Sequence, residues 1–106
     1  MPRPDGDMLL DALVACAGVT LRAVATSLGL DLRGGTVRAE GDLDFRGTLA
    51  VDRSVAVGFT DIRLSFELDT DAGPEDVATL QRLTERYCVV LQTITTPPRC
   101  TVSVTS

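Results

Sequence analysis

Residues 8–28 are almost entirely apolar, and this stretch constrains what the chain can fold into more than any other feature. An aspartate just before it, Asp5 or Asp7, can cap a helix, and Gly29 can end one. A helix that is apolar nearly all round must be covered on most of its surface. We therefore expect a long, central, buried helix. Its polar positions are Asp11, Thr20, Arg22, Thr26 and Ser27.

Two segments with alternating polarity follow this helix. Apolar and mostly charged side chains alternate over Val37–Phe45 and again over about Thr60–Asp69. Such alternation is typical of an antiparallel strand with one face on the core and the other in water. The core-facing residues are expected to be Val37, Ala39, Leu43 and Phe45, and then Ile62, Leu64, Phe66 and Leu68.

Residues 71–88 predict a second helix. Gly73 and Pro74 open it, acidic residues fill its first turn, and two arginines lie near its end. The spacing of its apolar side chains indicates which face packs on the rest of the protein. That face is expected to consist of Val77, Leu80, Leu83 and Tyr87.

A last strand is expected after Pro97–Pro98, where Cys100, Val102 and Val104 alternate with hydroxyl residues. The predicted order is therefore helix, strand, strand, helix, strand. This order favours one α+β domain over residues 1–106, with its helices packed on an antiparallel sheet.

Composition excludes several kinds of function. The net charge of −5 argues against binding nucleic acid or an anionic membrane surface. The chain contains neither histidine nor lysine, which removes histidine bases and lysine Schiff bases. The three cysteines lack the spacing of a metal site, so we expect neither metal nor cofactor.

The start of the chain does not resemble a signal peptide, and the apolar run is expected to be too short and too interrupted to span a bilayer. The thiols are expected to be reduced. Together these features favour a cytoplasmic protein.

Cys16 lies in the middle of the apolar helix. Its helical neighbours at three and four residues, Ala12, Leu13, Val19 and Thr20, are all uncharged. It is also more than two turns from the helix N-terminus, beyond useful reach of the helix dipole. Burial alone should therefore raise its pKa and leave an inert core residue.

The other two cysteines fall on different predicted elements. Cys88 is expected at the C-terminus of the second helix, where the helix dipole disfavours a thiolate. Such a thiol is better suited to resolving a disulfide than to attacking first. Cys100 is expected to face the core beside Val102 and Val104, as a small apolar residue.

Two segments resemble a known family. The segment "DMLLDALVACAGVTLRAVATSLGLDL" resembles the central helix of the OsmC/Ohr family of thiol-dependent hydroperoxide reductases. The segment "LTERYCVVLQTI" resembles the one that carries the family's second cysteine. The two cysteines occur in the expected order, and the resemblance covers about Met8–Val104.

The resemblance implies an OsmC-like fold in an intertwined homodimer, with active sites at the subunit interface and a role in oxidative or osmotic stress defence. Cys16 would match the peroxidatic cysteine, which attacks a hydroperoxide and becomes a sulfenic acid. Cys88 would match the resolving cysteine, which forms a disulfide with it. An external dithiol would then restore both thiols.

The chain also departs from the family pattern. Only seven residues precede the helix, where members usually have a strand region that carries a thiolate-stabilising arginine. Gly6 stands where the family's peroxidases have a glutamate, and Val89 follows Cys88 where proline is usual. Three alternatives therefore remain open: a weak or active peroxidase, a non-enzymatic OsmC-fold dimer that binds an apolar ligand or acts structurally, and an inactive fragment.

Overall fold

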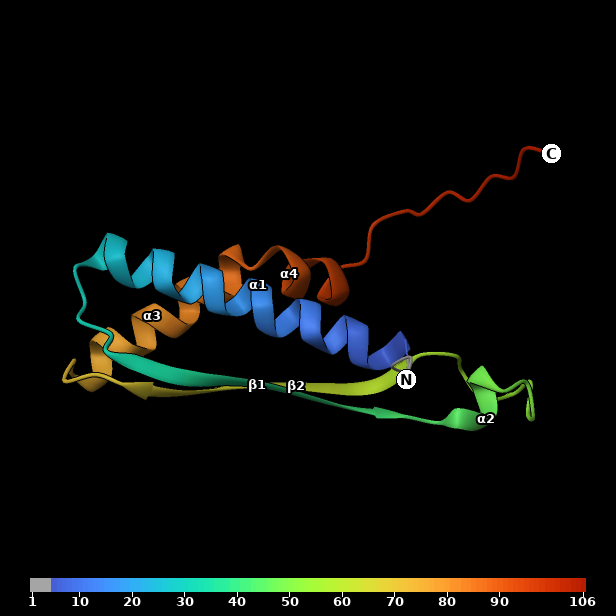
Figure 1. Ribbon diagram of the computed structural model, residues 1–106, viewed down its shortest axis with the longest axis horizontal. Coiled ribbons are helices and arrows are strands. Elements are labelled where there is room, and N and C mark those ends of the chain that lie inside the picture. The colour runs from blue at the N-terminus through green and yellow to red at the C-terminus, as the bar shows by residue number, and fades with distance from the viewer. Residues whose placement is uncertain (1–4) are drawn as a thin grey trace.

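The computed structural model describes residues 5–106, with side chains from Asp7 onward. Its elements in chain order are α1 (Asp5–Leu28), β1 (Gly34–Leu43), α2 (Phe45–Thr48), β2 (Phe59–Asp69), α3 (Pro74–Tyr87) and α4 (Val89–Thr95). The two strands pair as an antiparallel sheet, and α1, α3 and α4 lie together over one face of it (Figure 1). This confirms the predicted α+β class.

The ends of α1 show how the sequence defines this helix. Gly29 has a φ of 70°, and the N–H of Leu30 bonds to the carbonyl of Ala25 at 2.9 Å. This pattern is a Schellman cap, so the expected stop at Gly29 is confirmed. At the other end Asp7 lies within the helix instead of capping it, and the side chain of Asp5 lies outside the described residues.

Only one side of α1 is buried within the chain. Its buried positions recur every four residues and face the sheet and α3, whereas the opposite side is exposed. Part of the exposed side is apolar, and Val19 on it is 72% exposed, whereas Asp11 and Arg22 are exposed polar positions. The expectation of burial nearly all round is therefore not met by one copy of the chain. The buried positions are Leu13, Ala17, Leu21 and Ala25, and the exposed ones include Ala12, Ala15, Val19 and Ala23.

The same helix corrects an expectation about membranes. Asp7–Leu28, with a mean hydropathy of 1.8, is long and apolar enough to cross a bilayer by length and composition. The sequence had suggested that this apolar run is too short to span a bilayer, and by its length that expectation was wrong. One such helix is weak evidence for a membrane span, because the core helix of a soluble protein passes the same test.

The register of the sheet places the expected apolar residues on its helix-covered face. Val37 lies opposite Phe66, and Ala39 lies opposite Leu64. Apolar side chains on this face are half-buried, and the charged ones between them are exposed. The predicted alternation is therefore confirmed for both strands.

Phe45 is the exception to that alternation. It begins α2 and is exposed, because the carboxylate of Asp44 accepts a hydrogen bond from the backbone N–H of Arg46 at 3.0 Å and starts a helical turn there. The assignment of Phe45 to the core was wrong for this reason.

The second half of the chain contains the expected helix α3 and, directly after it, the helix α4, which the sequence had not indicated. Leu80, Thr84 and Cys88 are buried at intervals of four residues, so they form the inner edge of α3. Tyr87, which was expected on that face, is 59% exposed and lies beneath the guanidinium of Arg86 at 5.5 Å. Cys88 ends α3 and also begins α4.

The expected last strand is absent from the single chain. Residues 97–106 leave α4, run away from the body of the protein and pair with neither strand (Figure 1). Val102 and Val104 are each 89% exposed, and Cys100 is exposed instead of buried in the sheet. The alternating pattern is present, but the direction of the chain after Pro97–Pro98 leaves this segment without a partner strand.

The burial of α3 leads to a stability prediction. We expect Leu80→Ala to lower the free energy of unfolding by about 2–5 kcal/mol, because it opens a cavity between α1 and α3. Leu49→Ala, at an exposed position after α2, should change it by less than about 0.5 kcal/mol. Urea unfolding of both variants tests this, and equal losses would contradict the packing described.

Candidate redox site

The fold brings Cys16 and Cys88 together. Cys88 is fully buried in a cluster with Leu13 and Ala17 of α1, and Cys16 packs against the same cluster. The thiol of Cys88 hydrogen-bonds the sulfur of Cys16, and both cysteines are free of disulfides. The sequence-based expectation that these two residues lie near each other is confirmed.

The surroundings of Cys16 lower its pKa. The largest influence is the backbone N–H of Val90, which donates to the sulfur from the first turn of α4. Partial burial opposes this shift. Further donors, namely the thiol of Cys88, the N–H of Val89 and the hydroxyl of Thr20, add to the lowering. The expectation that the pKa of Cys16 is raised was therefore wrong.

Cys88 shifts in the opposite direction. Its burial is the largest cause and raises its pKa, because the surroundings disfavour a buried thiolate. The adjacent sulfur of Cys16 raises it further, whereas the N–H groups of Leu91 and Val90 only partly offset these effects. The pair thus combines a thiol that ionises more readily than usual with one that retains its proton.

The error about Cys16 has one structural cause, which is α4. Only neighbours on its own helix had been considered, and the donors come from residues far along the chain. Residues 89–95 are mostly β-branched, so their sequence disfavours a helix. Two threonine hydroxyls donate back to carbonyls within α4, Thr93 to Val89 at 2.7 Å and Thr95 to Leu91 at 2.9 Å.

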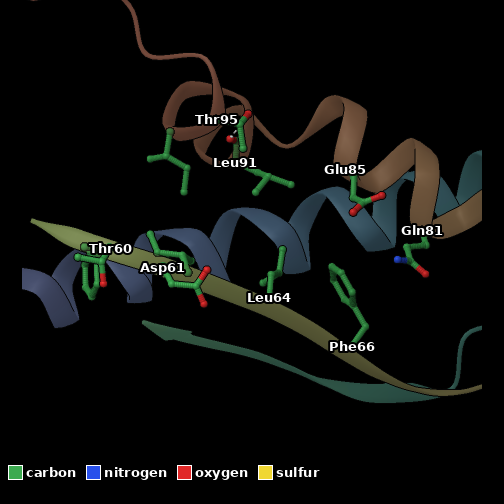
Figure 2. Close-up of a pocket in the computed structure, with 11 residues that line it drawn as sticks. Thr60, Asp61, Leu64, Phe66, Gln81, Glu85, Leu91 and Thr95 are labelled. Atoms are coloured by element: carbon green, nitrogen blue, oxygen red, sulfur yellow. Dashed lines mark hydrogen bonds between the residues drawn. The ribbon is translucent and has the colours of Figure 1, made fainter. Parts of the chain in front are cut away.

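A cleft of about 480 Å³ lies between β2 and the pair α3–α4 (Figure 2). Its polar edge includes Asp61, Gln81 and Glu85. Its apolar wall also packs against the cluster that contains Cys88. That wall consists of Ile62, Leu64, Phe66, Leu91 and Ile94.

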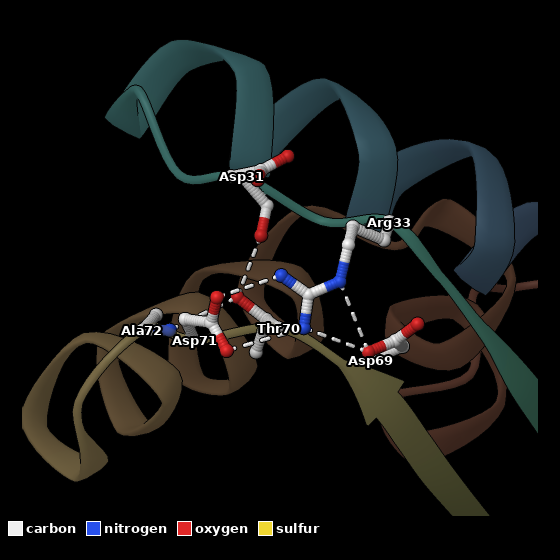
Figure 3. A network of polar contacts seen from close by, with 6 residues as sticks. All are labelled: Asp31, Arg33, Asp69, Thr70, Asp71 and Ala72. Atoms are coloured by element: carbon white, nitrogen blue, oxygen red, sulfur yellow. Dashed lines mark hydrogen bonds and ion pairs between the residues drawn. The ribbon is translucent and has the colours of Figure 1, made fainter.

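Surface carboxylates form ion pairs with two arginines at the sheet, Arg33 and Arg63. Arg33 pairs with Asp69 and Asp71 at 2.9 and 2.8 Å, and joins the start of β1 to the turn after β2 (Figure 3). Arg63 pairs with Asp42 at 3.0 Å on the solvent face. As expected for Arg63, its charge faces away from the core, so the donors that lower the pKa of Cys16 are uncharged ones.

Metal chemistry finds no support in the described residues. From Asp7 onward, no three histidine, cysteine, aspartate or glutamate side chains are grouped so that they could hold a metal ion.

The opposite pKa shifts give a direct test. In a Cys100→Ala background, ultraviolet thiolate absorbance should rise in two steps with pH, one below and one above the value of about 8.5 for a free thiol. Cys16→Ala should remove the lower step and Cys88→Ala the upper one. Thr20→Val, which keeps the shape but removes a donor, should move the lower step upward. Two steps that both lie above about 8.5 would contradict the site described.

Comparisons with known proteins agree with this fold. The family model described as OsmC-like protein matches residues 3–103. The crystal structure of an OsmC-like protein from Mycoplasma pneumoniae aligns with a TM-score of 0.74 at 16% sequence identity. The alignment covers 85% of this chain and 60% of that one, so the chain spans about three-fifths of the length of that protein. A search of curated proteins found no match.

At 16% identity the structural likeness establishes the fold alone, whereas the family model covers nearly the whole chain. The chain belongs to the OsmC-like protein family.

Proposed function

We propose that the chain is a thiol-dependent reductase of organic hydroperoxides, in which Cys16 attacks and Cys88 resolves. One observation carries this proposal: a thiol whose pKa is lowered by hydrogen-bond donors lies in contact with a second thiol whose pKa is raised. An attacking cysteine must be a thiolate, and its partner must remain protonated until the attack is complete.

The first step consumes the hydroperoxide. The Cys16 thiolate attacks the distal oxygen of R–O–O–H, a sulfur–oxygen bond forms, and the O–O bond breaks. The alkoxide that leaves takes a proton from water and departs as an alcohol. The sulfur is thereby oxidised to a sulfenic acid, S–OH.

The second step uses Cys88. Its sulfur attacks the sulfenic sulfur of Cys16, a disulfide forms, and the hydroxyl group leaves with the proton of Cys88 as water. Burial is the largest cause of the raised pKa of Cys88, and oxidation of Cys16 removes the negative charge that adds to it. Cys88 therefore becomes easier to ionise at the point where it is needed. An external dithiol then reduces the disulfide and is itself oxidised.

The proposal includes a homodimer. The chain exposes 7914 Å², whereas a compact folded monomer of this mass exposes about 5,700 Å². Its radius of gyration of 17.1 Å exceeds the value of about 13 Å for a compact domain of this length. A second copy against the exposed, alanine-rich side of α1 would cover apolar surface that this copy leaves open.

The proposed redox site also bears on where in the cell the protein works. Free thiols that must be reduced again after each turnover need a reducing environment, so we place the protein in the cytoplasm.

The second candidate function is non-enzymatic. The uncovered apolar side of α1 could take up an apolar ligand between the central helices of a dimer, and the thiols would then be inert packing groups. Turnover of hydroperoxide separates this function from the peroxidase, because only the peroxidase consumes both hydroperoxide and dithiol. An inactive fragment would show neither turnover nor ligand uptake.

We expect the protein to reduce cumene hydroperoxide with dithiothreitol as the reductant. Cys16→Ser should abolish turnover because no nucleophile remains. Cys88→Ser should leave a sulfenic acid on Cys16 that dimedone traps. Cys100→Ser is the matched control and should retain turnover, since Cys100 is exposed and lies in the extended tail. Equal activity of Cys16→Ser and the unmodified protein would refute the assignment.

We expect a homodimer at micromolar concentration in sedimentation velocity. Val19→Asp should weaken it, because a carboxylate is then desolvated at the contact between helices. Val57→Asp, at a similarly exposed position in the loop before β2, should leave the dimer intact. A monomer at these concentrations, or equal effects of the two variants, would rule out this interface.

A further inference from the structure

Gln92 crosses the break between α3 and α4. Its side-chain amide donates to the backbone carbonyl of Glu85 at 2.8 Å, seven residues back along the chain. Glu85 belongs to α3 and Gln92 to α4, so this hydrogen bond joins the two helices across Cys88. Gln92 is exposed, and neither step of the proposed reaction uses it.

The carbonyl of Glu85 is one that the break deprives of its usual partner. In an unbroken helix this carbonyl would accept a hydrogen bond from the N–H of Val89, four residues ahead. The backbone leaves the helical conformation at Cys88, and the N–H of Val89 donates to the sulfur of Cys16 instead. The amide of Gln92 therefore bonds to the acceptor that Val89 has given up.

The bond from Gln92 can form only when the helix is broken. In a continuous helix the Cα atoms of Glu85 and Gln92 would be about 10.5 Å apart along the axis, too far for a glutamine side chain to reach the carbonyl. The N–H groups of Val89 and Val90 would then bond to carbonyls of α3 and could not donate to Cys16. The Gln92 bond thus favours the broken arrangement, in which both N–H groups donate to sulfur.

Few other directional contacts orient α4 relative to α3. Leu91 and Ile94 pack against the core, but apolar packing is not directional, whereas a hydrogen bond is. The hydroxyls of Thr93 and Thr95 donate to carbonyls within α4 itself. Among the side-chain hydrogen bonds of the described residues, the one from Gln92 is the bond that joins α4 to α3.

We propose that Gln92 is a positioning residue of the redox site: it holds α4 at an angle to α3, so that the first N–H groups of α4 point to the sulfur of Cys16. This role rests on the proposed function only in taking Cys16 as the attacking thiol. Cys88 is the titratable group in contact with Cys16, and from Asp7 onward the charged side chains of α1, α3 and both strands are exposed. The ionisation of Cys16 therefore reports on its hydrogen-bond donors.

The first experiment measures how readily Cys16 ionises. In the reduced full-length chain, peptide mass spectrometry follows the rate at which iodoacetamide alkylates Cys16 as a function of pH. Gln92→Met keeps the length of the side chain but removes its donor, and should raise the midpoint by about 0.5–1 pH unit, a three- to tenfold change in the ionisation equilibrium. Thr93→Val removes a donor whose bond stays within α4, and should leave the midpoint unchanged. No shift in Gln92→Met, or equal shifts in both variants, would overturn the proposal.

The second experiment needs no substitution. NMR measures how fast the side-chain amide protons of Gln92 and Gln81 exchange with water. Gln81 is also exposed, on α3, and its amide makes no hydrogen bond within the described part of the chain. The proton that Gln92 donates to Glu85 should therefore exchange more slowly than the amide protons of Gln81. Equal rates would show that the bond between the helices does not form in solution, and would overturn the proposal.

Neither measurement uses a hydroperoxide. A chain that fails to reduce cumene hydroperoxide but shows the shift in midpoint would refute the peroxidase proposal and leave the role of Gln92 standing. In an active chain, Gln92→Met should lower kcat/KM for the hydroperoxide about three- to tenfold below the midpoint and restore it at higher pH, where Cys16 is fully ionised. An equal loss at every pH would indicate a merely structural effect and would overturn the positioning role.

Discussion

The backbone break at Cys88 determines the site. Its φ of −75° and ψ of 109° are not helical, so α3 stops there and α4 starts in a new direction. That change of direction aims the N–H groups of Val89 and Val90 at the sulfur of Cys16. The same residue is buried against α1 and supplies the second thiol. One residue thus fixes the direction of a helix, the ionisation of its neighbour and the proximity of both sulfurs.

Local patterns in the sequence were sufficient to predict most of the fold. Alternation located both strands, and Gly29 ended α1 as expected, because these features depend on contacts between residues close in the chain or on one face of an element. The errors at Phe45 and Tyr87 arose where a local cap or a change in helix direction overrode the apolar pattern. Periodicity alone cannot show where an element will end.

The site itself could be predicted only in part. The order and proximity of Cys16 and Cys88 followed from a family resemblance, whereas the ionisation of Cys16 depended on a helix formed by residues far along the chain. The composition of α1 likewise indicated that most of its surface is covered, but the sequence could not show which side one chain leaves exposed. In both cases the missing information concerned contacts between elements.

The two thiols stabilise the fold over opposite ranges of pH. The lowered pKa of Cys16 contributes stability above the pKa of the unfolded thiol, and this is lost as the pH falls through the folded value. The raised pKa of Cys88 contributes stability below the unfolded value, and this is lost as the pH rises through the folded one. Between the two folded values the favoured state of the pair holds one proton, with Cys16 ionised and Cys88 protonated. That single state suits both proposed steps, because the attacking sulfur is charged and the resolving sulfur is kept protonated, first by its burial and then by the charge beside it.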